Sequence, residues 1–215
     1  MGSIRFLCKI GHPPHITLVA NAVNSNHINQ TVEFLCNEGV KGITISHTIG
    51  AGFAKNNNQI GIDFWKYADI VKEAQEIAKR YGTKIGANTN FPFLINDTLG
   101  DIEPNKDLAS LLYGTIDGRR SLYIDYKGGI YPTSYDFGAK ELCLGNVRTD
   151  DLIEIWNKSN ILEEFRTAKA PKKCETCRYF DYCRGGPITN YNVAYFRGVN
   201  ENQIKCPLIS QVTVE

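Results

Sequence analysis

Four clustered cysteines constrain the structure of this 215-residue chain more than any other feature. Cys174 and Cys177 are three positions apart, Cys183 follows six residues later, and Cys206 lies further on. Two thiolates at the first spacing can bind one metal centre from a single turn of backbone, and a third nearby thiolate supplies most of a coordination sphere. We therefore predict a metal or iron–sulfur site at these four residues, with disulfides or unreactive thiols as the alternative.

The overall composition argues against several classes of partner and location. The formal net charge is +1, which provides no basic surface for nucleic acid or anionic lipid. No apolar run is long enough to span a membrane, and residues 1–9 are too short for a secretory signal. The cysteine total, seven, is odd, which argues against a disulfide scaffold and for a reducing compartment. We expect a cytoplasmic protein with no nucleic-acid or membrane partner.

The first half of the chain has an alternating pattern of strands and helices. Three apolar or β-branched segments indicate strands, and two segments with helical periodicity lie between them. The expected strands are 15–21, 40–46 and 84–88, and the expected helices are 31–37 and 64–81. Strand–helix alternation is typical of parallel β/α units, and this piece is too small to form a closed barrel.

The pattern changes after about Ile102. Residues 121–131 predict a β-hairpin with a glycine turn, and two short helices are expected at 152–157 and 161–168, just before the cysteine cluster. We therefore predict an α/β chain of two domains, a β/α part at 1–103 and a small α+β cysteine-bearing part at 104–215.

The second part resembles the SPASM domain, the C-terminal auxiliary-cluster module of radical S-adenosylmethionine enzymes that modify peptides and proteins. The resemblance extends from about Tyr113 to Leu208. It is carried by the cysteine spacing, by the text Leu144-Gly-Asn-Val-Arg-Thr-Asp-Asp-Leu-Ile-Glu-Ile-Trp-Asn, and by Cys183-Arg-Gly-Gly and Cys206-Pro.

The resemblance implies one cluster rather than two. Cys174, Cys177, Cys183 and Cys206 fall where the family places the ligands of its second auxiliary [4Fe-4S] cluster. Thr115, Thr133 and Pro187 stand where the first cluster should have cysteines, and none of them offers a soft ligand for iron. We expect a single [4Fe-4S] cluster on the four cysteines. Zinc, which also accepts four thiolates, is the alternative metal.

The first part resembles the late strands of the family's barrel, so the expected fold is a partial radical SAM-type (β/α) barrel followed by a SPASM-like domain. The sequence holds no Cys-x3-Cys-x2-Cys motif, which in this family binds the cluster that cleaves S-adenosylmethionine. We therefore expect that this chain does not cleave S-adenosylmethionine alone. Either a second polypeptide completes the barrel and supplies that cofactor's site, or the chain is a remnant or a fragment.

The resemblance implies a role in electron transfer and in holding a peptide or protein substrate. The alternative is a non-catalytic module that binds a peptide or partner and uses a structural metal. The sequence identifies no catalytic residue. Asn21, His47 and Asn88 are placed at strand ends, where they could meet a ligand, but turn chemistry or a structural role explains them as well.

Overall fold

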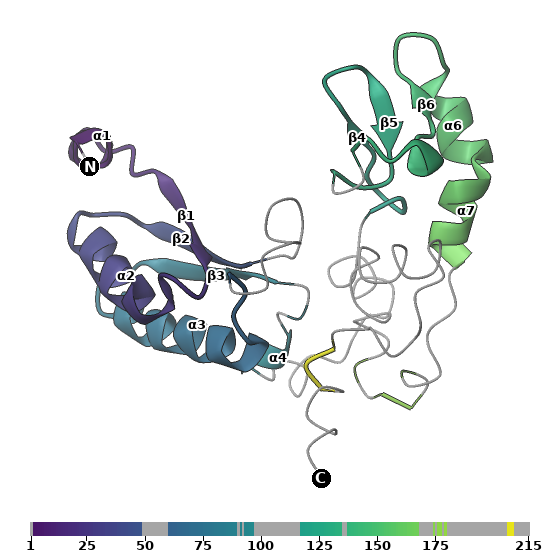
Figure 1. Cartoon of the computed structure of the whole chain (residues 1–215). Coiled ribbons are helices and arrows are strands. Elements are labelled where there is room, and N and C mark those ends of the chain that lie inside the picture. Colours follow the sequence, from purple (N-terminus) through teal and green to yellow (C-terminus); the bar gives the residue numbers. More distant parts are fainter. Residues whose placement is uncertain are drawn as a thin grey trace. The chain divides into compact units, whose positions relative to one another are not determined.

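The computed structural model describes residues 2–48, 60–89, 91, 93–96, 117–134, 137–167, 174, 176, 177, 179 and 206–208. The chain divides into two compact units, Met1–Glu103 and Pro104–Glu215, and each is considered by itself (Figure 1). Among the helices of the described ranges, none has the length and apolar character needed to cross a membrane.

The first unit is built on a three-stranded parallel sheet in the order β1-β2-β3. Its strands are β1 (His15–Ala20), β2 (Gly42–His47) and β3 (Lys84–Asn88). Thr17 lies opposite Thr44, which lies opposite Gly86. The predicted parallel arrangement is confirmed, and the described strands do not close into a barrel.

Two helices cover one face of this sheet, α2 (Ile28–Asn37) and α3 (Phe64–Lys79) (Figure 1). The core between sheet and helices is mostly aliphatic, with the fully buried side chains Val32, Ile43, Ile45 and Val71, and also contains the buried aromatic ring of Tyr67. Asp63 caps α3 by accepting hydrogen bonds from the backbone N–H groups of Trp65 (2.8 Å) and Lys66 (3.3 Å). A short helix, α4 (Phe93–Asn96), follows β3.

The start of the chain differs from the prediction. Residues Gly2–Lys9 form a helix, α1, that the sequence pattern did not predict. None of its residues is buried, and it is attached through Arg5, whose Nε and Nη2 donate to the two carboxylate oxygens of Glu38 at 2.6 and 2.7 Å. Such a helix lacks the long apolar periodicity on which sequence prediction depends.

The second unit contains a small antiparallel sheet, β4 (Tyr123–Ile124), β5 (Gly129–Tyr131) and β6 (Gly145–Asn146). The predicted hairpin corresponds to β4 and β5, and its turn has Gly128 at a φ of 87°, which favours glycine. The third strand, β6, was not predicted because two residues carry no detectable alternation.

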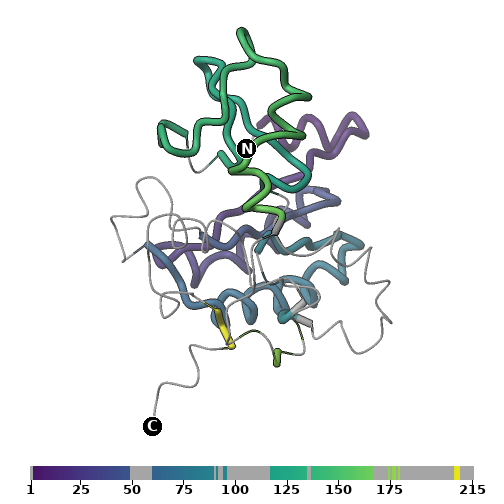
Figure 2. Tube along the Cα trace, turned by 90° about the vertical axis from the view of Figure 1, so that its right-hand side faces the viewer, coloured from purple at the N-terminus to yellow at the C-terminus, as the bar shows by residue number. Residues whose placement is uncertain are grey.

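Two helices, α6 (Leu152–Lys158) and α7 (Asn160–Thr167), follow one another with only Ser159 between them (Figures 1 and 2). A short 3₁₀ turn, η5 (Lys140–Leu142), precedes β6. The fully buried Phe165 packs against Gly118, where an added Cβ would lie 2.6 Å from the Phe165 ring. Arg119 donates from Nε to the Phe165 carbonyl at 3.3 Å and from Nη2 to the Arg166 carbonyl at 3.5 Å, so it holds the last turn of α7. This helix end precedes the cysteine cluster in the chain.

Candidate metal centre

The first two cysteines of the cluster lie in one closed turn. The backbone N–H of Cys177 donates to the carbonyl of Cys174 at 3.1 Å. Cys174 is buried, with 8% of its surface exposed, and Cys177 is half-buried. Both thiols therefore come from a single turn of backbone, which is the local geometry that a Cys-x2-Cys metal ligand pair requires.

The other two predicted ligands are described less completely. Cys206 is half-buried and precedes the buried Pro207, whereas Cys183 lies outside the described residues. Within the part of the chain that the structure describes, no three Cys, His, Asp or Glu side chains are close enough to bind one metal ion. The set of four ligands therefore stays a prediction.

No disulfide joins any of the six cysteines in the described ranges, which are Cys8, Cys36, Cys143, Cys174, Cys177 and Cys206. Reduced thiols on one turn fit the donor chemistry of both an iron–sulfur cluster and zinc. The described geometry is therefore compatible with a metal centre, and donor type alone does not distinguish the two metals.

Of the three positions that the resemblance assigns to a first cluster, Thr133 lies in the described part of the chain. Its side chain is buried, with 1% of its surface exposed, and a hydroxyl group is a poor ligand for iron. Its neighbour Pro132 accepts a hydrogen bond from the backbone N–H of Gly118 at 3.1 Å, so this region is held by protein contacts. Thr115 and Pro187 lie outside the described residues.

Cys143 lies apart from the predicted ligand set. Its thiol is exposed and donates to the carbonyl of Gly145 at 3.5 Å. Burial raises the pKa of the nearby Tyr131 hydroxyl, and Cys143 and Asp125 add to that effect. Because Cys143 is exposed and is not a predicted ligand, its replacement serves as a control for replacement of the clustered cysteines.

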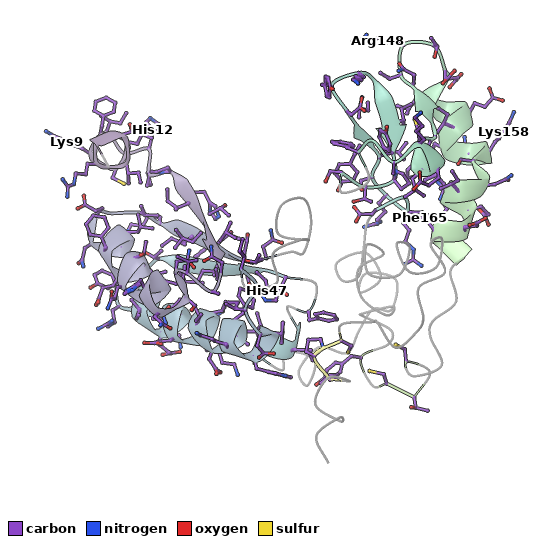
Figure 3. The ribbon with its side chains drawn as sticks, viewed as in Figure 1. Lys9, His12, His47, Arg148, Lys158 and Phe165 are labelled. Carbon is purple, nitrogen blue, oxygen red and sulfur yellow. The ribbon has the colours of Figure 1, made fainter. Side chains whose placement is uncertain are left out.

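The strand-end candidates of the first unit are engaged within the protein. His47, at the carboxyl end of β2, donates from Nε2 to the carbonyl of Ile62 at 2.9 Å, and its ring centroid lies 4.8 Å from that of Tyr67 (Figure 3). The Oδ1 atom of Asn21 accepts hydrogen bonds from Val23 and Asn24 backbone N–H groups at 2.9 and 3.1 Å. These contacts are turn and packing interactions.

Asn88 shows the same behaviour at the end of β3. Its Nδ2 donates to the Ser46 hydroxyl at 3.2 Å, across to the neighbouring strand.

Sequence reasoning missed a group of side chains around Asn146 that holds three turns of the second unit together. The only sequence signal for this group is the presence of Asp and Asn residues next to the glycine turn and to α6.

Comparison with protein families finds a match in the second part of the chain. Residues 116–179 match the family model of SPASM, an iron–sulfur cluster-binding domain. The matched segment contains the Cys174–Cys177 turn, β4 to β6, α6 and α7. The match thus falls on the part of the chain that resembles this domain, and it ends before Cys183 and Cys206.

Two curated relatives align with part of the chain, and both are named AdoMet-dependent heme synthase. The protein from Nitratidesulfovibrio vulgaris is 32% identical over 91 residues, which are 42% of this chain and 24% of that relative. The protein from Oleidesulfovibrio alaskensis is 33% identical over 82 residues, 38% of this chain and 20% of that relative. The chain thus spans about a quarter or less of the length of these relatives.

Solved structures of radical S-adenosylmethionine enzymes share the fold. Streptococcus suis SuiB bound to precursor peptide SuiA has a TM-score of 0.66 at 17% identity, over 85% of this chain and 42% of SuiB. The enzyme anSMEcpe with bound AdoMet and a Cp18Cys peptide has a TM-score of 0.54 at 16% identity, over 91% of this chain and 52% of that chain. The predicted fold, an incomplete β/α barrel followed by a SPASM-like domain, is confirmed.

Proposed function

We propose that this chain serves a radical SAM system that modifies peptides or proteins, because residues 116–179 match the SPASM domain and radical SAM enzymes share its fold. Its role in that system is to transfer electrons through one auxiliary cluster and to hold the substrate. The match of residues 116–179 to the SPASM domain carries the proposal.

The proposed cluster is one [4Fe-4S] centre on Cys174, Cys177, Cys183 and Cys206. The Cys174–Cys177 turn and the absence of disulfides among the described cysteines support this assignment. With one thiolate for each of four irons, the cluster has no open coordination position. Its chemistry would therefore be one-electron transfer or structural support, and the substrate would be bound by protein side chains.

Cleavage of S-adenosylmethionine is assigned to a polypeptide segment outside these 215 residues. None of the seven cysteines is arranged as Cys-x3-Cys-x2-Cys. A separate polypeptide that completes the barrel is one source of the missing cluster.

A peptide substrate is favoured by the solved structures, because SuiB is bound to precursor peptide SuiA and anSMEcpe to a Cp18Cys peptide. A second candidate is a role in haem formation, which is favoured by the name of the two curated relatives. These candidates differ in the substrate that the cluster-loaded chain should bind, a peptide or a haem precursor.

The deciding experiment is anaerobic reconstitution of the chain with iron and sulfide, followed by iron, zinc and sulfide analysis and by EPR after reduction with dithionite. We expect about four irons per chain and a reduced-cluster signal. Cys177→Ser should abolish both, because it removes a ligand from the central turn.

Cys143→Ser is the matched control, since it also removes a thiol from the second unit and should leave iron content and signal unchanged. One zinc ion per chain without sulfide would contradict the proposal. That result would favour a non-catalytic binding module with a structural metal.

A further inference from the structure

Three turns of the second unit are held together by side-chain-to-backbone hydrogen bonds. Asp125 Oδ1 accepts from the backbone N–H groups of Lys127 and Gly129, both at 2.8 Å. Asn146 Oδ1 accepts from the Arg148 N–H at 3.0 Å, and Asn146 Nδ2 donates to the Lys127 carbonyl at 3.1 Å. The β4–β5 turn and the turn after β6 are therefore joined through one asparagine.

The amino end of α6 belongs to the same network. Asp150 Oδ2 accepts from the Asn146 N–H at 2.7 Å, and Asp151 Oδ1 caps the helix by accepting from Ile153 N–H at 2.7 Å and Glu154 N–H at 3.1 Å. These acidic side chains are engaged by backbone N–H groups of the protein. Their charge is thus partly compensated before any partner arrives.

Two apolar side chains extend from these turns into solvent. Tyr126 is 86% exposed and Val147 is 41% exposed. The backbone N–H of Val147 donates to the carbonyl of Gly128 at 2.9 Å, so the two turns that carry these side chains are adjacent. A tyrosine exposed to this extent on an ordered turn resembles the aromatic anchors of protein interfaces.

Two cations flank these apolar side chains. The Lys127 ammonium lies 5.4 Å from the centre of the Tyr126 ring. Arg148 is exposed, and its guanidinium forms no hydrogen bond or ion pair in the structure of the described residues (Figure 3). The cationic groups are therefore available to a partner, whereas the neighbouring carboxylates are engaged.

From this arrangement we propose that Tyr126, Lys127, Val147 and Arg148 form a docking surface, the turn patch, for a polypeptide segment that carries acidic residues beside apolar ones. The apolar side chains of the partner pack on Tyr126 and Val147, and its carboxylates pair with Lys127 and Arg148. This assignment rests on the proposed substrate-holding function and adds to it the chemistry of the segment that is held.

The size and charge of the turn patch favour a polypeptide as its occupant. Two cations on a chain of net charge +1 cannot follow the phosphates of a nucleic acid. The network of Asp125, Asn146, Asp150 and Asp151 fixes the turns before binding, which reduces the entropy cost of docking.

The test uses cluster-loaded protein and three short synthetic peptides, one alternating Glu with Leu, one alternating Lys with Leu and one alternating Glu with Ser. Fluorescence anisotropy measures their affinities at low and high salt. We expect the Glu-Leu peptide to bind best and to weaken as salt rises. Tyr126→Ser should weaken it about tenfold and Arg148→Gln about threefold.

Matched controls separate the turn patch from general surface effects. Lys140→Gln removes an exposed cation elsewhere in the second unit, and Val23→Ser removes an exposed apolar side chain of the first unit. Neither should change peptide affinity. The assignment would be overturned if the Lys-Leu peptide bound as tightly as the Glu-Leu peptide, or if Tyr126→Ser bound the Glu-Leu peptide as tightly as the unchanged chain. Binding of phosphatidylserine vesicles in place of peptides would also overturn it.

The cluster provides an independent readout, because none of the patch residues is a predicted ligand. All patch variants should keep the iron content and EPR signal of the unchanged chain. If the cluster-loaded protein binds none of the three peptides, the turn patch is overturned and the cluster function stands. If the chain binds the Glu-Leu peptide but takes up no cluster, the turn patch stands and the proposed cluster function is overturned.

Discussion

At the scale of single residues, Tyr67 shows how one side chain connects a helix to the sheet beneath it. It is fully buried on α3, and its hydroxyl donates to the backbone carbonyl of Ile45 on β2 at 2.7 Å. Burial raises the pKa of this hydroxyl above its ordinary value of 10.0. The neutral phenol is therefore the form that the folded state favours.

Replacing Tyr67 with Phe should lower the free energy of unfolding by about 1–3 kcal/mol, because the Ile45 carbonyl loses its buried partner. The unchanged protein should also lose stability as the pH rises above about 10, since only the unfolded state ionises there. Below that pH, Tyr67 contributes no pH dependence. Urea unfolding between neutral and alkaline pH measures both effects.

In Tyr67→Phe, the loss of stability that ionisation of Tyr67 causes at alkaline pH should be absent. Tyr81→Phe is the control, since its hydroxyl makes a long 3.4 Å contact with Glu33 near the surface. An equal alkaline loss in the unchanged protein and in Tyr67→Phe would contradict the assignment.

Gly118 and Gly138 form a matched pair for a packing prediction. Both have positive φ, 65° and 88°, but an added Cβ clashes with Phe165 at Gly118 and meets nothing at Gly138. Gly118→Ala should therefore cost about 1–3 kcal/mol more than Gly138→Ala. Thermal unfolding of the cluster-loaded variants measures the difference, and equal effects would show that Phe165 moves aside without cost.

The sequence was most informative about residues with a chemical pattern. The cysteine spacing predicted a metal or cluster site, because few chemistries require thiols three and six positions apart, and the resemblance to the SPASM domain made iron–sulfur the expected type. It did not identify Asp125 or Asn146, since turn residues of these types are common and their partners are backbone groups. The ligand role of Cys183 and Cys206 stays a prediction.

At the scale of elements, periodicity determined which parts were predicted correctly. Strands β1 to β3 and helix α3 repeat their apolar residues over several turns or alternations, and they lie within a few residues of their predicted positions. Helix α1 was missed because it is short and none of its residues is buried, with Phe6 exposed, so no buried stripe distinguishes it. Asn24 precedes the next helical turn, but its side chain accepts a hydrogen bond from the Asn21 N–H and does not cap that turn.

The attachment of α1 should depend on the Arg5–Glu38 pair. The hydrogen bond from Arg5 lowers the pKa of Glu38, so the attachment is present at neutral pH and is lost as the pH falls through that lowered pKa. In Arg5→Gln, the backbone amides of α1 should exchange faster with deuterium, without a change in the unfolding of the sheet.

Lys79→Gln is the comparison for this variant, because it removes an exposed pair with Glu76 within α3. It should leave the exchange of α1 unchanged. Normal protection of α1 in Arg5→Gln would mean that the contact of Cys8 with Gly39 holds the helix instead.

At the scale of the whole molecule, the division into two units predicts two separate responses to metal removal. The proposed ligands all lie in the second unit, and the sheet β1-β2-β3 lies in the first. Stripping the cluster by oxidation and chelation should lower deuterium-exchange protection at α7 and around Cys174, because metal binding contributes to folding free energy.

Protection of the amides in β1 to β3 should not change in the same experiment. Deuterium exchange resolved by peptide, with and without the cluster, makes the comparison directly. A parallel loss in both units would show that they unfold as one cooperative body, and no loss in either would contradict a folding role for the metal.

The two tryptophans of the chain are divided between the units, Trp65 on α3 and Trp156 on α6. The Arg166 guanidinium carbon lies 4.5 Å from the centre of the Trp156 ring, whereas the ring centres of Trp65 and Phe64 are 5.2 Å apart. Each unit thus carries its own intrinsic fluorophore in a distinct environment. Replacing either tryptophan with Phe yields a protein whose tryptophan emission, excited selectively over tyrosine, reports on one unit alone without any attached dye.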